Sequence, residues 1–89
     1  MIKTHTTINN KLGLHARASA KLTKLAGSFP CDVFMSRGDR RINAKSIMGV
    51  MMLAAGMGTE VEIETSGEQE QAAMDAIVAL INDKFGEGQ

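Results

Sequence analysis

Hydrophobic and polar residues alternate most clearly over residues 60–65, where Val61, Ile63 and Thr65 are interleaved with three glutamates. A period of two is typical of a strand with one buried face, so we expect these three residues to point inward and the glutamates to lie in water. Residues 2–8 are rich in β-branched residues and also predict a strand. Further strands are predicted at 32–37 and 40–43, joined by a tight turn at Gly38-Asp39.

Apolar residues three or four positions apart predict three helices, over residues 16–26, about 47–55 and about 68–84. Ser46 has the side chain of a good N-cap for the middle helix. Residues 86–89 are expected to fray. The helix residues expected in the core are Ala18, Leu22, Leu25 and Ala26 in the first helix, and Ala73, Ile77, Leu80 and Ile81 in the last.

The predicted order of elements is β-α-β-β-α-β-α, without an internal repeat, a linker or a low-complexity segment. Short strands interleaved with one-sided helices indicate an α+β fold of two layers. We therefore predict a single domain over residues 1–89, built from a four-stranded antiparallel sheet with three helices on one face.

The composition narrows the class of protein. The chain has 89 residues, 44% of them hydrophobic and none of them Trp or Tyr, which predicts a folded domain with an aliphatic core. Its one cysteine, Cys31, cannot form an internal disulfide and suits a reducing cytosol. The first residues lack the apolar core of a secretion signal, and the longest apolar run, 47–57, is shorter than the ~20 residues that span a bilayer. We expect a cytoplasmic protein without membrane insertion.

Charge is divided unequally along the chain. Residues 1–45 carry nine of the ten Lys and Arg residues and two Asp, while residues 46–89 carry one Lys and eight acids. One interpretation is that two solvated faces happen to differ in sign. The other is a basic docking surface that steers acidic partners, since charge acts on encounter more than on fold.

The strongest candidate for chemistry is His15, which follows Gly13 and stands where the first helix is predicted to begin. A neutral imidazole is available as a nucleophile near neutral pH. A phosphoryl group on it would be favoured by the backbone N–H groups of Ala16 and Arg17, by the helix dipole and by the Arg17 guanidinium. The alternative is a surface histidine near a helix cap, with Arg17 solvated.

Other kinds of site have less support in the sequence. His5 lies in the middle of a predicted strand, and we expect it to be structural or exposed, without partners. We find no metal-ligand spacing, Ser–His–Asp set or phosphate-binding glycine motif. No metal or cofactor is therefore implied.

Two stretches of the sequence resemble a known family. Gly13-Leu14-His15-Ala16-Arg17 resembles the phosphohistidine motif of the HPr family, the histidine-containing phosphocarriers of the bacterial phosphoenolpyruvate-dependent phosphotransferase system (PTS). Residues 43–51, Asn-Ala-Lys-Ser-Ile-Met-Gly-Val-Met, resemble its second motif, and the similarity covers essentially the whole chain. Many members have proline where this chain has Ala18.

The resemblance implies an open-faced β-sandwich and a carrier, not an enzyme with independent turnover. It implies that His15 takes phosphate on Nδ1 from enzyme I, with Arg17 and the Ala16 backbone N–H stabilising it, and passes it to enzyme IIA proteins. A monomer without cofactor is expected.

The predicted middle helix has almost no polar face, which leaves two interpretations. Its apolar residues fall into two stripes along the helix. Both stripes could belong to the core, or Val50 and Leu53 could face the core while Ile47, Met48 and Met51 form an exposed docking patch. Flexible methionines suit a surface that fits several partners, and in the resembled family this helix contacts partners. The residues expected to bind partners are Ala20, Lys24, Lys45, Ile47, Met48 and Met51.

The sequence leaves alternatives for how the protein is regulated and for the branch of the phosphotransferase system to which it belongs. By resemblance, Ser46 is a candidate for phosphorylation by an HPr kinase/phosphorylase, which would place negative charge beside the docking patch. A nitrogen-related, regulatory branch of the system is an alternative, although the intact Lys45-to-Gly49 segment favours the sugar-type form. An RNA-binding or ligand-sensing α+β module is a remote alternative, because Phe34 is the one strand aromatic and the net charge is zero, so no nucleic acid is expected.

Overall fold

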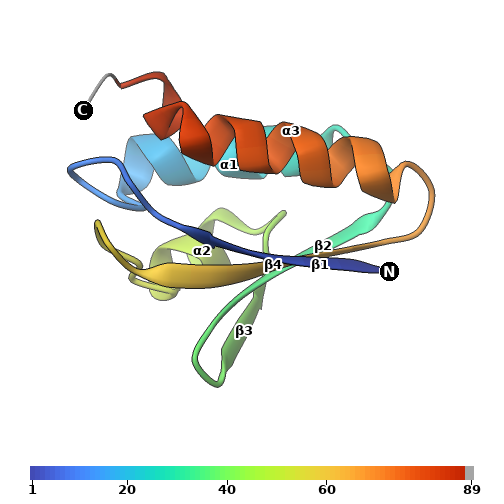
Figure 1. Ribbon diagram of the computed structural model, residues 1–89, viewed down its shortest axis with the longest axis horizontal. Coiled ribbons are helices and arrows are strands. Elements are labelled where there is room, and N and C mark those ends of the chain that lie inside the picture. The colour runs from blue at the N-terminus through green and yellow to red at the C-terminus, as the bar shows by residue number, and fades with distance from the viewer. Residues whose placement is uncertain (88–89) are drawn as a thin grey trace.

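The computed structural model describes residues 1–87, which form four strands, three α-helices and one short 3-10 helix (Figure 1). Their order confirms the predicted β-α-β-β-α-β-α arrangement. The elements are β1 (Ile2–Thr7), α1 (Ala16–Gly27), β2 (Asp32–Arg37), β3 (Arg40–Asn43), α2 (Ile47–Met52), β4 (Glu60–Ser66), α3 (Glu70–Asn82) and η1 (Lys84–Gly86).

The strands form one antiparallel sheet in the order β1-β4-β2-β3. β4 lies between β1 and β2, so that Ile63 pairs with Thr4 on one side and with Met35 on the other. α1 and α3 lie side by side over one face of the sheet (Figure 1), and α2 packs against α1 and β3. The predicted α+β fold, an open-faced sandwich, is confirmed.

The core lies between the sheet and the helices and is aliphatic, apart from Phe85 and the sulfur-containing side chains. Val61, Ile63 and Thr65 are buried, as the alternation predicted. Of the predicted helix residues, Leu25 and Leu80 are only half buried, because they line a shallow groove open to solvent. The predicted helix residues that are fully buried are Ala18, Leu22, Ala26, Ala73, Ile77 and Ile81.

The expectation that the glutamates of β4 lie in water is wrong for Glu64, which is 8% exposed. Arg41 on β3 reaches across β2, stacks over the Phe34 ring at 3.8 Å and places its guanidinium 3.0 Å from the Glu64 carboxylate. Lys3 on β1 lies 3.9 Å from the other carboxylate oxygen. Cross-strand cations therefore balance a charge that local alternation predicted to be solvated.

His5 is exposed, as expected, but it does have partners. Its Nε2 lies 3.1 Å from the Glu62 carboxylate and its Nδ1 3.5 Å from that of Glu60. The expectation of no partners was wrong, because a histidine and two glutamates on paired strands meet on one face of the sheet.

α2 ends at Met52, earlier than predicted, because Ala54 takes a left-handed φ of 56° and turns the chain. Arg40 donates to the Met52 carbonyl at 2.6 Å, and Arg37 donates to the carbonyls of Leu53 and Ala54 at 3.2 and 3.1 Å. The last carbonyls of a helix lack partners within it. Two of the cations in the basic half thus complete the end of α2.

α3 is shorter than predicted at both ends because the flanking residues leave the helical region. Gln69 has a φ of 65° and precedes the helix, and Lys84 has a φ of 54° and follows it. The expectation that residues 86–89 fray is wrong for Gly86 and Glu87, which turn back toward α1 and make contacts. Residues 88–89, named in the same expectation, lie outside the described residues.

Candidate functional site

His15 is the N-cap of α1. Its backbone is extended, with a ψ of −179°, and its carbonyl accepts the first helical hydrogen bond, from the Ser19 N–H at 2.8 Å. Its Nδ1 accepts from the Arg17 N–H at 3.3 Å, which satisfies one of the free donors at the start of a helix. The predicted position at the helix start is confirmed, and the side chain itself forms the cap.

Gly13 brings the loop before His15 against the loop after α2. It has a φ of 66°, and a Cβ at this position would lie 2.6 Å from the Ala55 carbonyl oxygen. The next residue, Leu14, donates its N–H to the same oxygen at 2.9 Å. Only glycine allows both the left-handed backbone and this close approach. The contact sets His15 relative to α2.

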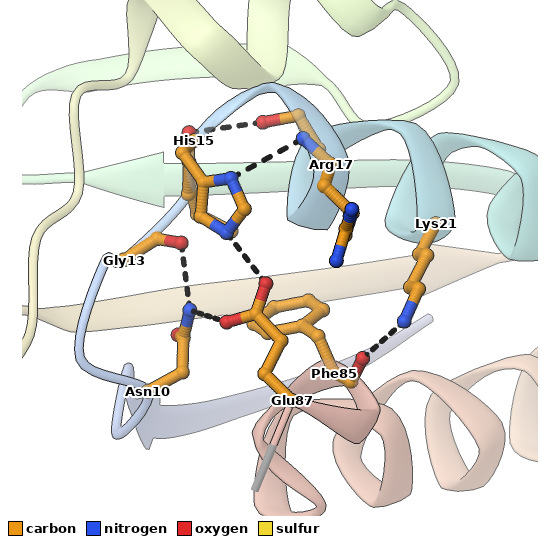
Figure 2. Close-up of polar contacts among 9 residues, drawn as sticks. Asn10, Gly13, His15, Arg17, Lys21, Phe85 and Glu87 are labelled. Atoms are coloured by element: carbon orange, nitrogen blue, oxygen red, sulfur yellow. Dashed lines mark hydrogen bonds and ion pairs between the residues drawn. The ribbon is translucent and has the colours of Figure 1, made fainter. Parts of the chain in front are cut away.

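The other ring nitrogen of His15 contacts Glu87, from the end of the described chain (Figure 2). The Nε2–carboxylate distance is 2.5 Å, and the second carboxylate oxygen of Glu87 accepts from Asn10 Nδ2 at 3.0 Å. The Asn10 amide, and then the neighbouring His15 and Lys21, lower the pKa of the Glu87 carboxyl below its ordinary value, although partial burial opposes them. Glu87 is thus a carboxylate at neutral pH.

Sequence reasoning missed Glu87 as a site residue. It lies 72 positions from His15, and its neighbours in the sequence are glycines that carry no motif. Glu87 reaches the site through the chain reversal after α3, and no pattern in the sequence predicts that reversal.

The two contacts of the imidazole assign its neutral tautomer. Nδ1 faces a backbone donor and so must present its lone pair, while Nε2 faces a carboxylate and so must carry the proton. The nitrogen with the free electron pair is therefore the one directed at the start of α1. An electrophile that displaces the Arg17 N–H from this lone pair meets the positive end of the helix dipole.

Basic residues gather beside His15. Lys11, Arg17 and Lys21 line a hollow that also contains the imidazole and Glu87. Figure 2 shows the Arg17 side chain extending beside the ring, between His15 and Lys21. The charge of the first half of the chain therefore converges in part on the site, while Arg37, Arg40 and Arg41 hold the fold elsewhere.

The apolar residues of α2 separate into a buried and an exposed set. Val50 and Leu53 are fully buried, and the side chains that we name the docking patch, Ile47, Met48 and Met51, are 41%, 66% and 41% exposed. This is the distribution that the docking interpretation requires, and the interpretation in which both stripes belong to the core is excluded. The role of the patch in binding stays a prediction.

The remaining predicted partner-binding residues differ in their exposure to solvent and in their contacts with the rest of the protein. Ala20 and Lys24 are exposed on α1. Lys45 is half buried, and its ammonium donates to the Phe29 carbonyl at 2.9 Å, so it links the end of β3 to the loop after α1. Met52, which lies beyond the predicted set, is 64% exposed.

Ser46 is the N-cap of α2, as predicted. Its Oγ accepts from the Gly49 N–H at 3.2 Å, and the residue is exposed at the edge of the docking patch. The side chain is therefore accessible.

Two kinds of feature are not found in the described part of the chain. Within residues 1–87, no group of three or more His, Cys, Asp or Glu side chains is arranged to hold a metal ion. None of the helices in the same range combines the length and apolarity needed to cross a membrane.

Comparison with known proteins gives a consistent match. The family model described as "PTS HPr component phosphorylation site" matches residues 2–83. The phosphocarrier protein HPr of Cupriavidus necator is 65% identical over 89 residues, which cover all of both chains. The crystal structure of HPr-C-His from Thermoanaerobacter tengcongensis superposes with a TM-score of 0.95 at 39% identity, covering 98% of each chain.

A more distant relative is a phosphocarrier with a different name. The phosphocarrier protein NPr of Shewanella violacea is 44% identical over 81 residues, which cover 91% of this chain and 89% of that protein. The identity to this NPr is thus lower than the identity to the C. necator HPr.

Proposed function

Because the chain belongs to the HPr family of PTS phosphocarriers, we propose that His15 accepts a phosphoryl group from phosphorylated enzyme I and passes it to enzyme IIA proteins. The observation that carries the proposal is the His15 ring at the start of α1, with its Nδ1 lone pair facing the Arg17 N–H beside a basic hollow. The protein is then a carrier, and the active sites that drive each transfer belong to its partners.

In the proposed step, the Nδ1 lone pair attacks phosphorus. The bond between phosphorus and the donor atom of enzyme I breaks, and its electron pair stays with the donor. The Arg17 N–H, released from Nδ1, turns to a phosphate oxygen, and the Ala16 N–H and the Arg17 guanidinium add further donors. Positioning and charge stabilisation do most of the work in this class of reaction.

Docking is proposed to use the patch on α2 together with Ala20 and Lys24, which are exposed on α1. Basic side chains around His15 favour acidic partner surfaces and raise the encounter rate. Lys45 would contribute through its charge, since its ammonium already has a partner in Phe29.

We propose that phosphorylation of Ser46 by an HPr kinase/phosphorylase weakens this docking. The exposed Ser46 hydroxyl stands beside Ile47, so a phosphate there would bring negative charge to a surface meant for acidic partners. Incubation with the kinase should label wild type and leave Ser46→Ala unlabelled. Equal rates of transfer to the phosphorylated and unmodified protein would contradict the regulatory role.

The sugar-type branch is favoured over the regulatory branch by the higher identity to the C. necator HPr than to the S. violacea NPr. Parallel transfer assays with a sugar-type and a nitrogen-type enzyme IIA separate the two, and faster transfer to the nitrogen-type protein would reverse the assignment. We further propose that the carrier acts as a cytoplasmic monomer, which sedimentation at working concentration tests.

The central test is phosphorylation with enzyme I and phosphoenolpyruvate, read by intact mass. Wild type should gain one phosphoryl group, His15→Ala should gain none, and His5→Ala should behave as wild type. His5 is a matched control because it is the other histidine of the chain and is exposed on the open face of the sheet. Undiminished labelling of His15→Ala would overturn the proposed function.

A further inference from the structure

The chain makes a sharp reversal after α3 that aims Glu87 at the site. Three consecutive residues have a left-handed backbone, with φ values of 54° at Lys84, 55° at Phe85 and 73° at Gly86. This conformation is unfavourable for residues other than glycine. Two interactions hold the reversal: Phe85 is fully buried, and its carbonyl accepts from Lys21 Nζ at 2.6 Å. Local strain that is maintained in this way is most often found at functional sites.

Both carboxylate oxygens of Glu87 are used by groups of the His15 loop. One lies 2.5 Å from His15 Nε2, and the other accepts at 3.0 Å from Asn10 Nδ2. Asn10 is fully buried and also donates to the Gly13 carbonyl at 2.8 Å, so the carboxylate is fixed to the turn that carries the histidine. The Glu87 side chain is 13% exposed, which strengthens its contacts relative to those of a solvated pair.

These contacts do more than anchor the chain end. The burial of Phe85 and the bond from Lys21 already hold the reversal without Glu87. The Glu87 carboxylate lies against the His15 ring, as the carboxylate of a Ser-His-Asp triad lies against its histidine, where it fixes the tautomer and stabilises the imidazolium. The His15 imidazole is therefore held between a backbone donor at Nδ1 and a carboxylate at Nε2.

We propose that Glu87 is a positioning residue for His15, holding the proton on Nε2 so that the Nδ1 lone pair meets the incoming phosphoryl group. The inference rests on the proposed function and adds to it a residue outside the sequence motifs. When Nδ1 forms its bond to phosphorus and the donor bond breaks, the ring keeps its Nε2 proton and gains positive charge. The Glu87 carboxylate stabilises that charge, and returning the phosphoryl group to an acceptor restores the neutral ring.

The test compares Glu87→Gln and Glu87→Ala with wild type and with Glu68→Gln, an exposed glutamate at the opposite end of α3. The first readout is the NMR spectrum of the His15 ring in unphosphorylated protein at a pH where the ring is neutral. We expect a downfield Nε2–H signal in wild type and Glu68→Gln, an upfield shift in Glu87→Gln, and loss of the signal by solvent exchange in Glu87→Ala. The second readout is the rate of phosphoryl acceptance, which should fall about tenfold in both Glu87 variants at an unchanged KM for enzyme I.

The outcomes separate the two proposals. A ring spectrum that is the same in Glu87→Ala as in wild type overturns the positioning role, and so does an acceptance rate at the wild-type level. A raised KM with an unchanged kcat also overturns it, because Glu87 would then be a partner contact. If wild type itself gains no phosphate, the proposed function fails, while the ring spectra still decide whether Glu87 fixes the proton. Thermal unfolding of each variant checks that the fold is retained.

Discussion

α1 and α2 begin in the same way but with different side chains. At the start of α1 the Arg17 N–H donates to His15 Nδ1 at 3.3 Å, and at the start of α2 the Gly49 N–H donates to Ser46 Oγ at 3.2 Å. His15 has a second nitrogen that is bound by Glu87, whereas Ser46 is exposed beside the docking patch. A helix can therefore hold a nucleophile at its N-cap. The lone pair accepts a hydrogen bond from a backbone N–H until an electrophile takes the place of that N–H.

The largest expected effects come from exchanging the two caps for alanine. His15→Ala should abolish phosphoryl acceptance, because it removes the ring that takes the phosphate, and should cost about 1 kcal/mol of unfolding free energy for the lost capping bond. Ser46→Ala should cost about 1 kcal/mol, the usual value for a lost serine cap, and accept phosphate at the wild-type rate. Urea unfolding measures the stability of the two variants, and intact-mass labelling measures their phosphoryl acceptance. If Ser46→Ala also lost acceptance, the division between a reactive cap and a structural cap would be wrong.

The next effect concerns the loop before α1, which contains Gly13 and contacts the loop after α2. Gly13→Ala should lower the free energy of unfolding by roughly 2–4 kcal/mol, the sum of a left-handed alanine and a backbone clash. Its Cβ would lie 2.6 Å from the Ala55 oxygen and 2.7 Å from the Gly56 Cα. Gly27→Ala, at the last position of α1, is the matched control, since a Cβ there meets nothing within 4 Å. Equal stability of the two variants in urea would show that the loop contact is dispensable.

A smaller effect is expected from charge on the exposed face of α2. Met48→Glu should raise the KM of enzyme I for this protein about tenfold, which corresponds to about 1.4 kcal/mol, and leave its thermal unfolding unchanged. Ala72→Glu adds the same charge on an exposed position of α3 and should have no effect on transfer. Val50→Glu should instead unfold the chain, because it buries an unpaired charge. Unfolding of Met48→Glu would remove the distinction between the two faces of α2.

The smallest effect comes from α3, whose start lacks a side-chain cap on Gln69. There the Glu70 carboxylate accepts from the Gly67 N–H at 2.9 Å, and this bond, with the Met1 amino group, lowers the pKa of Glu70 below its ordinary value. A group with a lower pKa in the folded state stabilises the fold above its unfolded pKa, about 4.3 for glutamate, and loses that contribution as pH falls through the folded value.

We therefore expect the unfolding free energy of wild type to decrease as pH falls below about 4.3, and to decrease less in Glu70→Gln. Glu68→Gln, at an exposed neighbouring position, should follow wild type. A series of urea titrations from neutral to acid pH measures the difference. Parallel curves for wild type and Glu70→Gln would show that this third kind of helix start carries no charge-dependent stability.

The parts of the fold that depend on local patterns were predictable. Alternation over residues 60–65 predicted the buried face of β4, and helical spacing located α1. Spacing divided the apolar residues of the middle helix into two sets but did not decide which set is exposed. The pattern failed at Glu64, where Lys3 and Arg41 arrive from β1 and β3. Helix ends were also misplaced, since Ala54 and Lys84 adopt left-handed backbone that their residue types do not favour.

The candidate site was predictable on one side only. His15, Ala16 and Arg17 are adjacent in sequence, so their chemistry could be inferred from the order of residues. Asn10 and Glu87 approach the ring through a loop and through the reversal after α3, and long-range contacts of this kind leave no periodic signal. Sequence therefore predicted the position of His15 at the start of α1 and missed the carboxylate at its second nitrogen.

The main-chain bond from Leu14 to Ala55 has a consequence for the proposed exchange of partners. At 2.9 Å it joins the turn carrying His15 to the exit of α2, and so helps to set the position of the His15 ring relative to the docking patch. A partner that meets such a surface needs the correct orientation and no folding step, and orientation alone allows association rates of about 10⁵–10⁷ M⁻¹s⁻¹. In the proposed relay, the number of transfers per second would then depend mainly on how soon each complex dissociates.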